Sequence, residues 1–298
     1  MSWRKVAGLA VLVLLASPLT ALAWGPITHV KLASDLLEQL QLLPAAVAIV
    51  LARCRKDFLF GNIAADVVVA KRLSRVKQIC HHWDTGFAIL DDARTDRARA
   101  FAYGYLSHLA ADTVAHGKFL PRQMTLTRTT MSFGHLYWEM RADATVATRY
   151  RHVLRQVFRD VSAEHRASLH ARLTDTFLPF EMNWGFFYRT NRLLSLGLLR
   201  RAMYQWSHAS RWQLPGELTR QYRAECLELM VDVLTNKHAA QVCHEDPNGN
   251  AALAYTRLQR RQLRQMARAG LIVPHVYHEA ASSHAPKLND QSAYRQPA

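Results

Sequence analysis

Residues 108–116 read His-Leu-Ala-Ala-Asp-Thr-Val-Ala-His, within a stretch from Asp91 to about Ala115 that predicts one long helix. His108, Asp112 and His116 stand four residues apart, so at 3.6 residues per turn they form a row along one face of that helix. Two imidazoles and a carboxylate therefore converge on the same side. The alanines between them leave room for a second helix or a metal ion. We expect this helix to carry a metal site.

The rest of the chain predicts more helices. They are expected over residues 27–56, 133–159, 161–175, 186–206, 216–238 and 249–269. Strand-like alternation is nowhere sustained, and only 12 Gly and 10 Pro in 298 residues argue against a loop-rich β sandwich. Gly117 is expected to end the long helix. The fold class is therefore all-α, with a single multi-helix domain over residues 24–270 and a weakly ordered tail over residues 271–298.

Residues 1–23 carry the pattern of a secretory signal peptide. Two basic residues precede an apolar run from Val6 to Leu15, and Ala21-Leu22-Ala23 supplies small residues at the cleavage positions. The apolar run is too short to span a bilayer. We expect cleavage between Ala23 and Trp24 and a secreted or periplasmic mature protein. Trp24 would then carry a free α-amine, which could itself bind a metal.

More metal-ligand candidates surround the row. On the next predicted helix, His135 and Glu139 repeat the spacing of four. Earlier in the chain stand His29, Asp66 and the doublet His81-His82. Zinc accepts this mixture of imidazole nitrogen and carboxylate oxygen. The four cysteines form no C-x-x-C pair, which excludes a Cys-rich zinc finger and leaves disulfides and free thiols equally open.

The charge balance is strongly basic. Lys and Arg number 38 against 23 Asp and Glu, a formal net charge of +15. This favours an acidic partner such as phospholipid head groups or nucleic acid, and says nothing about fold. Five arginines gather along the last predicted helix: Arg257, Arg260, Arg261, Arg264 and Arg268. They would either meet an anionic membrane in peripheral contact or form a solvated helix face.

In their order along the chain, these candidates resemble the zinc-dependent phospholipase C family, which includes fungal-type zinc nucleases and the catalytic domain of glycosylphosphatidylinositol-specific phospholipase D. The resemblance implies an all-α zinc hydrolase with up to three ions. One zinc ion would be held by Asp66, His108, Asp112 and one of His81 and His82. A second would be held by His116, His135 and Glu139. The third would take the Trp24 terminus, His29 and the other oxygen of Asp112, which would bridge two ions.

The resemblance also implies the chemistry: hydrolysis of phosphodiesters by a zinc-activated water, with Asp66 as both ligand and general base. The short step from Asp112 to His116 looks more like the phospholipase D branch than the toxin-like phospholipases, so the toxins' substrate is not carried over. We favour a phospholipase C acting on phospholipids. The alternatives are a single-strand nuclease of the same fold and a non-catalytic zinc-binding envelope protein.

Overall fold

The computed structural model describes residues 24–271 except 70, 72, 128–130, 160, 197–200, 202–203, 206, 208 and 211. This part of the chain is helical and contains no strand, which confirms the predicted all-α class. The predicted signal peptide and, beyond Leu271, the predicted tail lie outside the described residues. No helix in the described ranges is both long and apolar enough to cross a bilayer.

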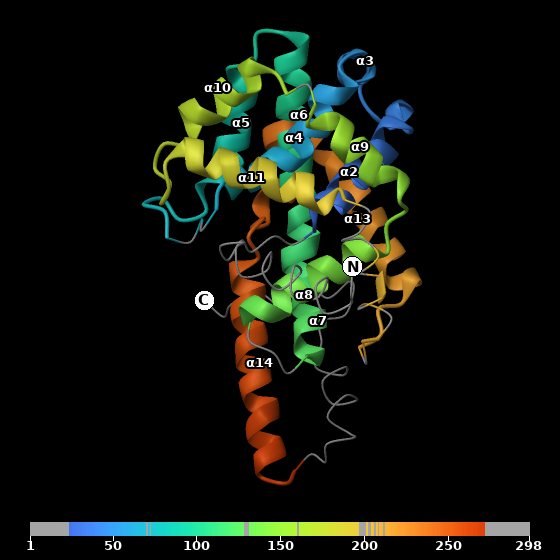
Figure 1. The fold of residues 1–298 in the computed structure, drawn as a ribbon, viewed down its shortest axis with the longest axis vertical. Coiled ribbons are helices and arrows are strands. Elements are labelled where there is room, and N and C mark those ends of the chain that lie inside the picture. Colours follow the sequence, from blue (N-terminus) through green and yellow to red (C-terminus); the bar gives the residue numbers. More distant parts are fainter. Residues whose placement is uncertain are drawn as a thin grey trace.

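Figure 1 shows how the helices are arranged. In chain order they are α2 (Pro26–Leu37), α3 (Ala45–Arg53), α4 (Arg55–Ala64), α5 (Trp83–Asp91), α6 (Asp96–Val114), α7 (Leu120–Leu126), α8 (Met131–Ala144), α9 (Arg149–Val157), α10 (Ala163–Arg172), α11 (Phe180–Leu194), α13 (Gly216–Asn236) and α14 (Asn250–Arg268). Two 3-10 turns, η2 (Ala65–Val67) and η3 (Ile79–His81), carry candidate metal ligands.

Two of the predicted helices are divided, and the helix expected over residues 186–206 instead begins at Phe180 and ends at Leu194, as α11. The stretch 27–56 forms α2, α3 and α4, because Pro44 starts a new helix at α3 and Cys54 leaves helical geometry. The stretch 133–159 forms α8 and α9. Three of the four residues between them, Thr145, Val146 and Thr148, are β-branched, and such residues lose side-chain freedom in a helix.

The long helix begins later and continues further than predicted. Asp91 ends α5, whereas α6 starts after Thr95, whose hydroxyl accepts a hydrogen bond from the Ala98 amide at 3.0 Å. The prediction that Gly117 ends the helix is wrong. The chain instead passes through a π turn, η4 (Ala115–Phe119), directly into α7. Pro121 does not interrupt this path, because it lies in the first turn of α7, where helix geometry tolerates proline.

Two glycines allow α4 and α6 to cross in backbone contact. A Cβ on Gly61 would lie 2.0 Å from the carbonyl oxygen of Phe101, and one on Gly104 would lie 2.2 Å from that of Phe58. The Asn62 side-chain amide spans the crossing and donates to the Gly104 carbonyl at 3.2 Å. This close approach brings η2, which follows α4, against the half of α6 that carries the histidines.

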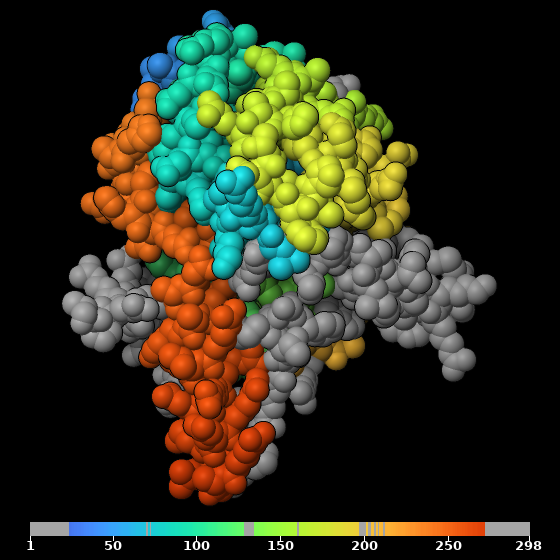
Figure 2. Space-filling model, turned by 90° about the vertical axis from the view of Figure 1, so that its left-hand side faces the viewer, coloured from blue at the N-terminus to red at the C-terminus, as the bar shows by residue number. Residues whose placement is uncertain are grey.

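The last helix leaves the body of the protein. Near its start, α14 packs against η4 and α7. Its later turns extend away from the upper group of helices (Figure 1), and the same part projects in the space-filling view (Figure 2). The fold thus joins a buried site around α6 to a protruding basic helix.

Candidate metal centre

The row predicted on α6 forms as expected. His108 Nε2 lies 3.3 Å from Asp112 Oδ2, and His116 Nδ1 lies 3.6 Å from the same oxygen. All three side chains are buried. His116 lies within the π turn, a distortion that often occurs at functional sites.

Asp66 on η2 and His81 on η3 join the row on α6. His81 Nε2 lies 3.1 Å from Asp112 Oδ2 and 3.4 Å from Asp66 Oδ1. It also lies 3.2 Å from His108 Nε2. His82 is half-buried at the start of α5 and belongs to neither of the close ligand groups found among the described residues. Of the doublet, His81 is therefore the residue that the fold places at the cluster.

His29 enters the cluster from α2. Its ring stacks on that of His108, with 4.0 Å between centroids, and its Nε2 lies 3.3 Å from Asp112 Oδ1. Despite this distance, neither atom has a hydrogen-bond partner of acceptable geometry among the described residues. Two groups have ligand atoms that all lie within 4.8 Å of one another: His29, Asp66, His108 and His81, His108, Asp112.

Backbone carbonyls fix the orientation of two of the imidazoles. His108 Nδ1 lies 3.0 Å from the Asn62 carbonyl oxygen, and His116 Nδ1 lies 2.7 Å from that of Pro247. A carbonyl only accepts hydrogen bonds, so each Nδ1 carries the proton and each Nε2 keeps a lone pair. This arrangement is typical of metal-binding histidines, whose second nitrogen donates to a fixed acceptor.

The loop that leads into α14 is a part of the site that the sequence did not indicate. Besides the Pro247 carbonyl, it supplies Asn248, whose side chain donates to the His81 carbonyl at 3.2 Å. Asp246 shapes the loop by accepting from the amides of Asn248 and Asn250 at 2.9 and 3.0 Å. An Asp-Pro-Asn-Gly-Asn sequence indicates a turn, but nothing in it indicates contact with residues more than 100 positions earlier.

Lys71 is a second unforeseen member. Its side chain is 2% exposed, and its Nζ lies 3.4 Å from Asp66 Oδ1 and 3.2 Å from His81 Nε2. The sequence shows Lys71 only as one of several basic residues in a connection. Here it places a positive charge among the carboxylates.

Comparison with family models identifies the chain. The model described as zinc dependent phospholipase C matches residues 28–192. This protein belongs to that family. Comparisons with curated proteins and with solved structures gave no match. The match includes the candidates from His29 to Glu139 and ends before the loop that contacts His116.

Of the remaining predicted ligands, His135 lies beside His116, and Glu139 and Trp24 are buried. The His116 and His135 rings are 5.3 Å apart between centroids, and Glu139 is buried. His116, His135 and Glu139 are not among the groups within 4.8 Å in the described ranges. Trp24 is fully buried and stacks on Phe119 at 4.5 Å.

Asp143, which was not among the predicted site residues, ties the start of α2 to α8. Its carboxylate accepts from the amides of Ile27 and Thr28 at 3.3 and 2.9 Å, and from the Thr28 hydroxyl at 2.6 Å. It thereby holds the turn between Trp24 and His29. Asp143 lies four residues after Glu139, as Glu139 lies four residues after His135, and this repeated spacing could have indicated that Asp143 faces the same side of α8.

Burial and mutual charge shift the pKa values of several residues of the cluster. Burial lowers the pKa of His116 to about 4, so its ring is neutral at neutral pH and available as a ligand. Burial opposes ionisation of Asp66, but the charges of His108 and Lys71 outweigh it and hold the pKa of Asp66 below its usual range. Burial, reinforced by the charges of Asp143 and Asp66, raises the pKa of Glu139 well above normal.

These residues fit the zinc that the family requires. The donors are imidazole nitrogens and carboxylate oxygens, the types that zinc binds. Buried polar atoms without hydrogen-bond partners among the described residues include His29 Nε2, Asp112 Oδ1 and Glu139 Oε2. A buried polar atom is normally satisfied, so bound cations would account for these donors. The four cysteines are free thiols and do not join the close groups.

Proposed function

We propose that this protein is a secreted or periplasmic phospholipase C that hydrolyses the phosphodiester of phospholipids. Membership of the zinc-dependent phospholipase C family supports a phospholipase C-like hydrolase. The observation that carries the proposal is the convergence of His29, Asp66, His81, His108 and Asp112 from four separate segments of the chain. When bound, zinc would lower the pKa of water and offset the charge of the phosphate.

The protein's own residues would act in distinct ways. His29, His81 and His108 would present Nε2 to zinc around Asp112, whose two oxygens face different histidines. Asp66 lies within ligand distance of His29 and His108, and neighbouring positive charges keep its carboxylate ionised, so we assign it first as a ligand. Its side chain, 8% exposed, is the least buried of this set, and from there it would receive the proton of the attacking water.

We further propose up to three zinc ions and cleavage between Ala23 and Trp24. The outer ligands would be His116, His135 and Glu139 for one ion, and the freed Trp24 terminus for another. The hold of Asp143 on the first turn of α2 supports this assignment, because it keeps Trp24 close to His29. Elemental analysis of the protein beginning at Trp24, compared with one carrying an added residue before it, tests the number of zinc ions and the role of the Trp24 terminus. The extended form should lose one ion selectively.

The test of activity compares two histidine variants. Purified, zinc-loaded protein should release diacylglycerol and a phosphorylated head group from phosphatidylcholine vesicles. His116→Ala should abolish this release. His152→Ala should not, because that histidine is exposed on α9. Cleavage of heat-denatured DNA without lipid hydrolysis would replace the proposal with a nuclease. Cleavage of neither, with zinc retained, would leave a zinc-binding protein without this activity.

A further inference from the structure

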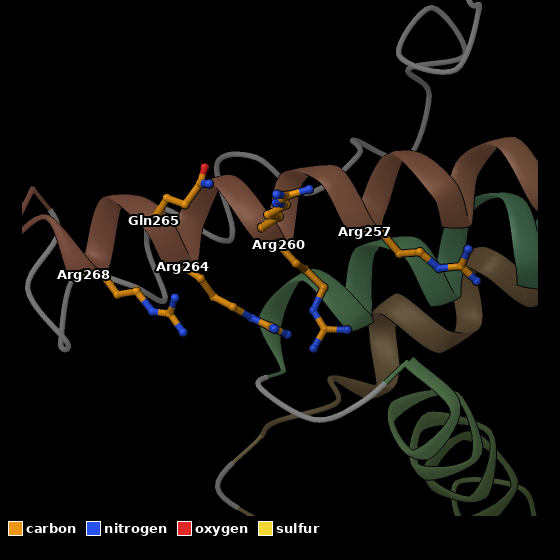
Figure 3. Close-up of a pocket in the computed structure, with 6 residues that line it drawn as sticks. Arg257, Arg260, Arg264, Gln265 and Arg268 are labelled. Carbon is orange, nitrogen blue, oxygen red and sulfur yellow. The ribbon is translucent and has the colours of Figure 1, made fainter.

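The protruding part of α14 carries a row of exposed arginines. Arg257, Arg261, Arg264 and Arg268 are separated by four, three and four residues, which places them on one face of the helix. At 1.5 Å per residue the row is about 16 Å long. In Figure 3 the side chains of Arg257, Arg264 and Arg268 extend to the same side of α14, and Gln265 extends to the other.

This row has no counter-charge in the described part of the chain. None of the four exposed arginines forms an ion pair there, whereas Arg220 on α13 pairs with Glu217. No Asp or Glu occurs between Pro247 and Leu271. Like charges spaced three and four residues apart destabilise a helix, so the row favours an external anion. A hollow of about 410 Å³ adjoins it, lined by Arg257, Arg260, Arg261, Arg264, Gln265 and Arg268.

We propose that this row is a docking surface for anionic phospholipid membranes. The inference rests on the proposed phospholipid substrate and adds how the enzyme reaches it. Guanidinium groups bind phosphate oxygens strongly, and a straight row on a projecting helix can meet the head groups of a plane. Leu271, 73% exposed, stands just beyond Arg268, where it can enter the interface.

The features of α14 favour a membrane over nucleic acid. Binding of single strands normally combines basic residues with aromatic side chains on which bases stack. Tyr255 is the one aromatic residue in α14, and at 100° per residue it lies nearly opposite Arg257. The row itself offers charge and no stacking surface.

Docking through α14 would also orient the metal centre. The helix begins one residue after Gly249, within the loop whose Pro247 carbonyl holds His116. The surface that meets the membrane and the loop that contacts the ligands are thus consecutive in the chain. Lipid docked at the row would be brought to the side of the protein from which this loop reaches the cluster.

The experiment is co-sedimentation with phosphatidylcholine vesicles that contain or lack phosphatidylglycerol. An arginine near an anionic surface contributes about five-fold to binding, so Arg264→Gln with Arg268→Gln should weaken partitioning to anionic vesicles about 25-fold. Glutamine keeps helix propensity similar to that of arginine. The matched control is Arg189→Gln with Arg192→Gln, an equal charge change at exposed positions of α11, which should change partitioning little.

Activity separates docking from catalysis. Hydrolysis of a soluble short-chain phosphatidylcholine should be the same for the α14 variant and the wild type, whereas hydrolysis of anionic vesicles should fall with binding. His116→Ala should still sediment with vesicles. Vesicle binding without any lipid hydrolysis would support the docking surface and refute the proposed function. Equal vesicle binding by the α14 variant and the wild type, or arginine-dependent binding to single-stranded DNA without vesicle binding, would overturn the docking surface.

Discussion

Replacing Gly249 by alanine is expected to weaken the fold and the zinc site together. Gly249 has a φ of +57°, and a Cβ there would lie 2.4 Å from the carbonyl oxygen of His116. The left-handed conformation costs a non-glycine residue about 1–2 kcal/mol. Relief of the clash would move the loop and break the 2.7 Å hydrogen bond between His116 and Pro247, a further loss of about 0.5–1.5 kcal/mol.

The expected sum is a loss of about 1.5–3.5 kcal/mol in the free energy of unfolding, or about 3–14 °C in melting temperature. Loss of the acceptor that orients His116 should also weaken zinc binding about 10–100-fold, measured by competition with a chelator. Gly270→Ala is the matched control, because Gly270 also has a positive φ, +72°, but nothing lies within 4 Å of its Cβ position. Zinc affinity and melting temperature equal to those of the control would refute this account of the loop.

Three other substitutions test separate features. Asp143→Ala removes the acceptor at the start of α2 and should cost about 1–2 kcal/mol in urea unfolding, with zinc per chain reduced because His29 is displaced. Gly104→Ala forces α4 and α6 apart and should cost about 1–3 kcal/mol, read by calorimetry; an unchanged melting temperature would contradict the close crossing. Burial alone would raise the pKa of the Asp57 carboxyl, but hydrogen bonds from His165 and Arg97 outweigh burial and lower this pKa. The resulting stabilisation is full above the unfolded-state pKa of about 4 and is lost as the pH falls through the lower pKa of the folded state. Asp57→Asn should therefore make the melting temperature fall less steeply at acid pH. An unchanged fall would show that the hydrogen bonds of Asp57 do not cause the acid sensitivity.

The sequence was sufficient where local spacing determines geometry. His108, Asp112 and His116 lie on one helix, so their convergence follows from 3.6 residues per turn and was confirmed without knowledge of any other segment. The all-α class followed from periodicity for the same reason. His29 and Asp66 could be placed only through the family resemblance, because their approach depends on how α2 and α4 pack against α6.

Contacts made through backbone atoms could not be predicted. The carbonyls of Asn62 and Pro247 orient two histidines, but a carbonyl is present at every residue and leaves no signature in the sequence. The choice of His81 over His82 depends on the direction in which a 3-10 turn presents neighbouring side chains. The prediction that Gly117 ends the helix is wrong because the π turn keeps the backbone helical through this glycine.

The five residues Ala115–Phe119 also determine an angle. They join α6 to α7 without a break, and α14 packs against both the turn and α7. Winding these five residues as ordinary α-helix, without the widened turn, would rotate the following segment by about one residue position, roughly 100°, around the axis. Helix α14 would then point in another direction relative to the histidines. The widened turn therefore fixes the direction of α14 relative to the metal centre. It thereby also sets the angle that a lipid docked on α14 would need for its phosphate to reach the ligands.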